Sequence, residues 1–199
     1  MKTILTLLIP LIFIFNSTNL YSQYSAEEKS SLLYTLQEEK VAFDFYNEMF
    51  TKYSEKVFEN VSSAEKTHQE HVLNLLNELN INAESYNQNA GEFSTKELQD
   101  MYNLLIKTGN YSFTDALLAS ARYEEKDISD LKNYRSKASN ENIISLFECL
   151  EKASQNHLRA FVKNLKTEGI TYKSSVLSAE EFNEIINSKN QGGDCFQSK

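Results

Sequence analysis

Residues 140–168 read NENIISLFECLEKASQNHLRAFVKNLKTE, and this stretch decides the fold class. Apolar side chains recur at spacings of three and four residues and form one helical face: Ile143, Phe147, Leu150, Phe161 and Leu165. Ser154 and His157 fall on the same face, where apolar residues are expected. Asn140 is a favourable N-cap residue, and Gly169 ends the pattern. The stretch therefore predicts a long amphipathic helix whose buried face is interrupted by polar side chains.

The same periodicity continues toward the N-terminus. Long helices are predicted over residues 25–53, 58–79 and 114–131, and a shorter one begins with the Ser94-Thr95-Lys96-Glu97 capping box. The shorter helix lies in the stretch 80–114, which is long enough to cross a bundle from end to end. A single long crossover between the second and third long helices is the connectivity of ferritin-like bundles. We therefore expect an all-α, ferritin-like four-helix bundle with a long crossover between helices 2 and 3 carrying a short extra helix.

The composition excludes other classes of protein. The 199 residues include only five glycines and one proline, too few for the turns of an all-β fold or the Gly-rich loops of an α/β fold. The net charge is −8, and no cluster of lysine and arginine stands out. Nucleic-acid binding is therefore not expected.

The first 22 residues have the order of a secretory signal peptide: Lys2, an apolar run from Ile4 to Phe15, then polar residues. The apolar run is too short to span a bilayer, which takes about 20 residues. We expect a signal peptide over 1–22, a ferritin-like domain over 23–168, and a C-terminal tail over 169–199 with a short helix. The predicted location is periplasmic or extracellular, with no membrane span after cleavage. Export would allow a Cys149–Cys195 disulfide, with free thiols as the alternative.

Each apolar stripe contains ionisable residues at a position where a core residue is expected. These residues are Glu39, Glu65, His68, Glu124 and His157. A buried carboxylate must become neutral, pair with a cation or bind a metal. Carboxylate-bridged di-iron bundles take one Glu from each of two helices and Glu-x-x-His from each of the other two. The five residues are therefore the predicted metal ligands. Iron is the expected metal, with manganese or zinc as alternatives and one or two ions per chain.

Four stretches also resemble a known family. They are LQEEKVAFDFY (36–46), SAEKTH (63–68), YEEKDISDL (123–131) and SQNHLRAFV (154–162). They are similar to domain of unknown function 2202, a ferritin-like group. The resemblance covers about residues 28–166 and implies the fold and candidate ligands, but no established activity.

The sequence departs from a complete di-iron pattern at one position. Helix four offers Ser154-x-x-His157 where a second Glu-x-x-His would stand, so the second metal is expected to bind weakly or not at all. Glu38 and Glu125 are the alternative ligands if a helix register is off by one. Asp127 is a candidate to orient a ligand histidine. Tyr46 is expected to be a core tyrosine rather than a redox participant.

Two functions are compatible with these features. One is an exported metal-binding protein, with iron oxidation or the reduction of oxygen or peroxide as its chemistry. The other is a non-enzymatic helical module of the cell envelope with a vestigial polar core. The partner is a metal ion in the first case. The sequence leaves open whether the protein is an enzyme or a homo-oligomer.

Overall fold

The structure, a computed structural model, describes residues 24–84 and 86–189. Within these ranges the chain forms six helices and no strand. The helices are α1 (Ala26–Tyr53), α2 (Lys56–Glu78), α3 (Lys96–Gly109), α4 (Phe113–Lys137), α5 (Glu141–Thr167) and α6 (Ala179–Asn187). The all-helical prediction is therefore confirmed, with the long helices close to their predicted ranges.

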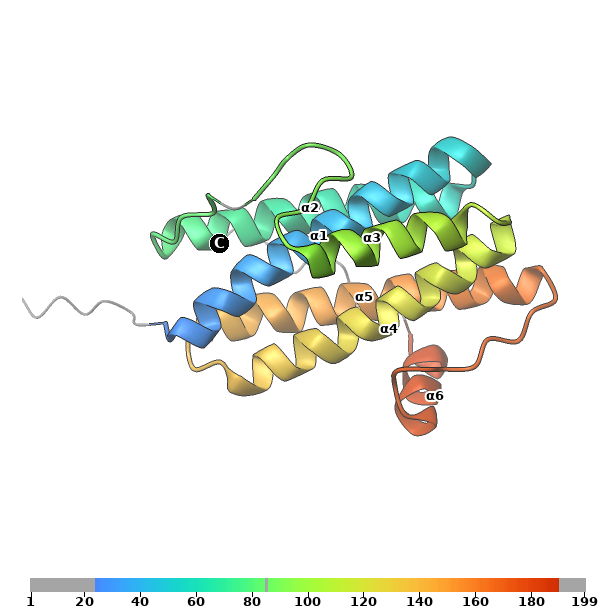
Figure 1. Cartoon of the computed structure of the whole chain (residues 1–199). Coiled ribbons are helices and arrows are strands. Elements are labelled where there is room, and N and C mark those ends of the chain that lie inside the picture. The colour runs from blue at the N-terminus through green and yellow to red at the C-terminus, as the bar shows by residue number, and fades with distance from the viewer. Residues whose placement is uncertain (1–23, 85, 190–199) are drawn as a thin grey trace, which may run out of the picture.

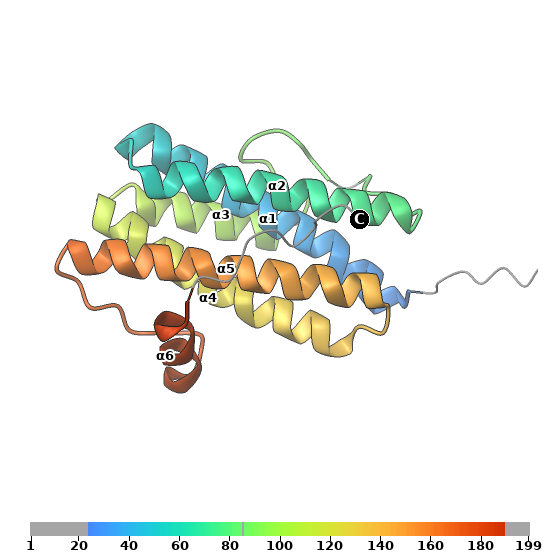
Figure 2. The same cartoon turned by 180° about the vertical axis from the view of Figure 1, so that it is seen from behind.

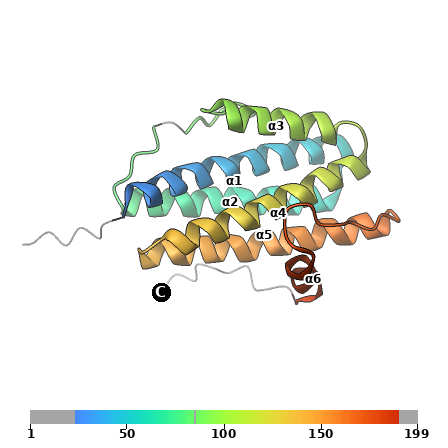
Figure 3. The same ribbon diagram turned by 60° about the horizontal axis from the view of Figure 1, so that its bottom comes forward.

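The four longest helices pack as two hairpins (Figures 1 and 2). α1 packs against α2 and α4 against α5, while α1–α4 and α2–α5 contacts join the hairpins. α2 and α4 run in the same direction, so the chain between them returns along the length of the bundle. α3 lies in this connection and covers α1 and α4 from outside (Figure 3).

Side-chain caps determine where several helices begin. Ser25 and Glu28 form a reciprocal capping box at the start of α1. Asn140 caps α5 by accepting hydrogen bonds from Asn142 N and Ile143 N. The capping box predicted from Ser94 to Glu97 is wrong by one residue. Thr95 is the cap of α3, and the third helical position holds Leu98, which has no carboxylate to complete a box.

The apolar core is divided into two clusters. One contains Phe45, Met49, Phe58 and Phe161, together with side chains from α3 and α6. The other lies toward the opposite end of the bundle and is formed by these residues: Leu32, Leu36, Val72, Leu75, Leu76, Ile81, Leu131, Ile143, Leu146, Phe147 and Leu150. Each of the four long helices contributes residues to both clusters. The ionisable residues predicted as metal ligands lie between the two clusters.

The segment after α5 packs back onto the bundle. Phe182 and Ile185 of α6 are buried in the first cluster, and Ser175 N and Val176 N donate to Glu125 Oε2 at 2.8 and 2.7 Å. None of the helices over residues 24–84 and 86–189 is long and apolar enough to cross a membrane. The predicted signal peptide and Cys195 lie outside the described residues, so export and the Cys149–Cys195 bridge stay predictions.

Candidate metal centre

The five predicted ligands converge in the bundle interior. Glu39 comes from α1, Glu65 and His68 from α2, Glu124 from α4 and His157 from α5. The exposed fractions are 3% or less for the three glutamates and 8% for each histidine. Four helices therefore contribute polar side chains to one buried cluster.

Glu65 lies at the centre of this cluster. Its Oε2 is 2.7 Å from Nδ1 of His68, and its Oε1 is 2.9 Å from Nδ1 of His157. The two imidazole rings stack with their centroids 5.6 Å apart. One carboxylate therefore has a histidine at each of its oxygens, which is the arrangement of a bridging ligand.

A further glutamate completes each half. Oε2 of Glu39 lies 3.2 Å from His68 Nδ1, and Oε2 of Glu124 lies 3.5 Å from His157 Nδ1. The donor atoms of Glu39, Glu65 and His68 lie within 4.8 Å of one another, and so do those of Glu65, Glu124 and His157. The cluster thus consists of two three-residue groups that share Glu65, and each could hold a metal ion.

Burial and charge shift the pKa values of these groups in opposite directions. Burial opposes ionisation of Glu65, but the two histidines hold its pKa well below the ordinary range. Burial and the charge of Glu65 raise the pKa of Glu39 to about 8. Burial opposes protonation of His68, yet Glu65 and Glu39 raise its pKa to about 10. Without metal, protons therefore supply the positive charge that the carboxylates require.

The residues fit a metal ion by their chemistry and spacing. Carboxylate oxygen and imidazole nitrogen suit iron, manganese and zinc. Ligands about 2.1 Å from one ion lie roughly 3 Å apart when they bind at right angles, close to the donor separations of 2.7–3.5 Å found here. Glu39 Oε1 is buried and makes no hydrogen bond. A cation in the cluster would give this atom a partner.

The alternative ligands have other partners. Glu38 Oε1 pairs with Lys126 Nζ at 2.6 Å, and Glu125 accepts from the backbone of the segment before α6. Asp127, the candidate to orient a ligand histidine, has Ser154 as its partner instead: its Oδ2 accepts a hydrogen bond from Ser154 Oγ at 2.5 Å. The sequence did not reveal that Ser154 faces a carboxylate on the neighbouring helix.

Tyr46 belongs to both the apolar core and the polar cluster. Its hydroxyl donates to Glu124 Oε1 at 2.5 Å, and its ring centroid is 5.2 Å from that of Phe161. Tyr46 is fully buried, and burial and Glu124 raise the pKa of its hydroxyl well above its usual value. The hydroxyl is therefore a neutral donor that fixes the orientation of Glu124.

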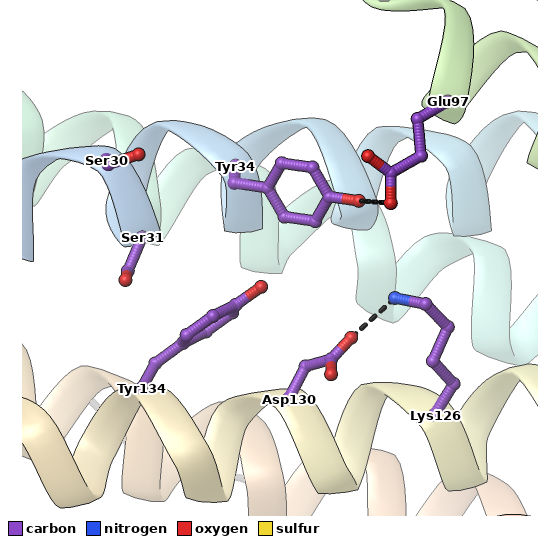
Figure 4. A pocket seen from close by; sticks show the side chains of 7 residues that line it. All are labelled: Ser30, Ser31, Tyr34, Glu97, Lys126, Asp130 and Tyr134. Carbon is purple, nitrogen blue, oxygen red and sulfur yellow. Dashed lines mark hydrogen bonds and ion pairs between the residues drawn. The ribbon is translucent and has the colours of Figure 1, made fainter. Parts of the chain in front are cut away.

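A surface pocket of about 330 Å³ lies between α1 and α4. Figure 4 shows Tyr34 of α1 hydrogen-bonded to Glu97, and Lys126 paired with Asp130, which is one turn further along α4. None of the five predicted ligands lines this pocket. Lys126 lines this pocket and also donates to the buried Glu38. The sequence did not suggest this contact, because the two residues are 88 positions apart.

Fold and site together define an all-helical protein with buried Glu/His groups that could hold a metal ion. Residues 28–189 match the family model described as uncharacterized protein domain DUF2202, and the chain belongs to this family. The match extends through α6, beyond the stretches that carry the resemblance in the sequence.

A relative is found in the archaeon Methanocaldococcus jannaschii. The uncharacterized protein MJ0754 is 38% identical over 169 residues, which are 85% of this chain and 91% of the relative. The crystal structure of hypothetical protein MJ0754 superimposes with a TM-score of 0.82 and covers 84% of this chain and 95% of the solved one. The name of the relative assigns no activity, so function must be argued from the site.

Proposed function

We propose that this chain is an exported, ferritin-like metal-binding protein and that Glu39, Glu65, His68, Glu124 and His157 hold iron between its helices. The observation that carries the proposal is Glu65, whose two oxygens each face a histidine and a further glutamate. The long connection between α2 and α4, which returns along the length of the bundle, supports the ferritin-like assignment. The order of residues 1–22, typical of a signal peptide, supports export.

The chemistry we propose for this site is redox chemistry at iron. Iron held there would supply Fe(II) oxidation or the reduction of oxygen or peroxide. The protein contributes ligands that exchange protons for the ion, an apolar cluster on each side, and a neutral tyrosine that orients Glu124.

Metal content and stability test this function. Protein purified without chelator should contain near-stoichiometric iron, manganese or zinc. Binding to the folded state alone should stabilise it by about 2.7 kcal/mol at a hundredfold excess over Kd. Glu65→Gln keeps the side-chain volume but removes the shared charge, and should abolish this increment. Glu70→Gln, on the exposed face of the same helix, is the matched control and should keep it.

The rival function is a helical envelope module with a vestigial polar core. It predicts metal-free protein and a melting temperature that does not respond to added metal. Equal responses in the Glu65 and Glu70 variants would refute the assignment of Glu65.

A further inference from the structure

Another surface pocket lies where α3 packs on α4, outside the polar cluster. Its volume is about 500 Å³, and small-molecule sites typically measure about 300–1,000 Å³. The two helices and the segment before α6 all contribute to its wall. None of the five predicted metal ligands lines it, so this pocket is separate from the candidate metal centre.

Most of the pocket wall is apolar. Leu105 and Tyr123 line it and are buried, whereas Leu104 and Val176 line it and are 63% and 43% exposed. Four large apolar side chains are exposed among the residues that the structure describes, and two of them face this one pocket. A ligand that covered Leu104 and Val176 would remove their apolar surface from water, which favours binding.

The charged residues that line the pocket are both cations, although the chain has a net charge of −8. Lys126 is already paired with Glu38 and Asp130. Arg122 is exposed and makes no ion pair or hydrogen bond within the described part of the chain. A guanidinium group binds a carboxylate through two parallel N–H···O bonds. Arg122 is therefore available to an anionic group in the pocket.

The cations and the apolar side chains of α4 lie at different positions along the pocket. Leu118 and Ala119 come first along the helix, and Arg122 and Lys126 follow. The wall from Leu118 to Lys126 is about 12 Å long at about 1.5 Å per residue. An extended chain advances about 3.6 Å over three backbone bonds, so a chain of about ten bonds fits this length.

We propose that this pocket binds a linear carboxylate of about ten carbon atoms, with its carboxylate on Arg122 and its chain against Leu104 and Val176. This site goes beyond the proposed metal binding and does not depend on it. A slender ligand fits better than a second copy of the chain. A specific protein interface buries about 1,000 Å² or more, whereas only two large apolar side chains are exposed at this pocket.

Calorimetric titration of the full chain with hexanoate, octanoate and decanoate tests the proposal. Each further methylene that becomes buried should lower Kd about fourfold, so decanoate should bind roughly 250-fold more tightly than hexanoate. Decanol has the same chain length without the charge. The difference between decanoate and decanol therefore measures the contribution of the carboxylate.

Two variants separate the charged contact from the apolar one. Arg122→Gln should weaken decanoate about fivefold, as for an ion pair at a partly open site, and leave decanol unchanged. Leu104→Ala should weaken both ligands by about three- to tenfold. Leu104 is largely exposed, so this variant should fold normally. Lys107→Gln removes an exposed charge of α3 outside the pocket lining and is the control, with binding as in the wild type.

Three results would overturn the proposal. They are no binding of decanoate, an affinity that does not depend on chain length, and an affinity that is unchanged in Leu104→Ala. Equal losses in Arg122→Gln and Lys107→Gln would overturn the carboxylate contact. A wild-type dimer in sedimentation velocity that Leu104→Ala dissociates would assign the pocket to a second copy of the chain instead. None of these results depends on metal content, so the proposed metal binding is tested separately.

Discussion

Glu28 joins the beginning of α1 to the beginning of α5, and its replacement by glutamine should destabilise the protein measurably. Its Oε1 accepts from Ser139 N at 2.6 Å and Asn140 N at 2.9 Å, and its Oε2 accepts from Ser25 N at 2.6 Å. Glutamine has one oxygen for these donors, so at least one N–H would face an amide NH₂ group. A buried hydrogen bond to a charged group contributes about 1.5–3 kcal/mol. Glu28→Gln should therefore lower the free energy of unfolding by about that amount.

Urea denaturation at pH 7 measures this loss, and Glu27→Gln is the matched control. Glu27 precedes Glu28 and carries the same charge, but it pairs with Lys137 at the surface, where ion pairs contribute about 1 kcal/mol or less. For a domain of this size, a loss of 2 kcal/mol corresponds to a fall of roughly 4–8 °C in Tm. Equal losses in the two variants would refute the reasoning.

The pH dependence gives an independent check on Glu28. Burial opposes its ionisation, but hydrogen bonds from Ser25, Asn140 and Ser139 lower its pKa from 4.5 to about 2. The stabilisation is therefore fully present above the unfolded pKa of 4.5 and is lost as the pH falls toward 2. The difference between wild type and Glu28→Gln should shrink over this window, and a difference independent of pH would contradict the assignment.

Two further substitutions test packing and buried charge. Gly109→Ala should lower the free energy of unfolding, measured by urea denaturation, by about 1–3 kcal/mol. A Cβ there would lie 2.9 Å from a ring carbon of Phe45 and would force α3 away from α1. Unchanged stability would refute this close approach. Lys126→Met should lower the free energy of unfolding by about 3–5 kcal/mol at pH 7, because it leaves the buried Glu38 without its cation. Lys96→Met removes a lysine from an exposed i,i+4 pair and should cost less than about 1 kcal/mol. Similar costs in the two variants would refute the importance of the buried pair.

The site could be predicted in outline because helical periodicity determines which residues share a face. Glu65 and His68 are three residues apart, so the sequence alone places them together. The contact between Asp127 and Ser154 could not be predicted in this way. It joins two helices, and its existence depends on their relative rotation and depth of packing. From the sequence Ser154 therefore stands in the place of a missing ligand, whereas in the structure its hydroxyl donates to Asp127.

The first helix shows a second limit of periodicity. Spacings of three and four residues put Phe43 and Phe50 on the same helical stripe as Leu36 and Glu39, but the two phenylalanines are only partly buried. Phe45 and Met49 are fully buried instead. α1 contacts α2, α3 and α4, so most of its circumference is covered. A helix covered on several sides has no single apolar stripe, and buried charges such as Lys40 become compatible with it.

Buried charges outside the cluster show what is unusual about those within it. Glu28 is satisfied by backbone N–H groups, and Asp44 by Lys40 Nζ and Gly91 N. The carboxylates around Glu65 instead depend on protons on the neighbouring groups to balance their charge, and Glu39 Oε1 makes no hydrogen bond. Replacing such a buried polar group by apolar residues is often neutral or stabilising by about 1–4 kcal/mol. A bundle that needed only stability would gain from joining its two apolar clusters, so the polar layer between them supports the proposed metal binding.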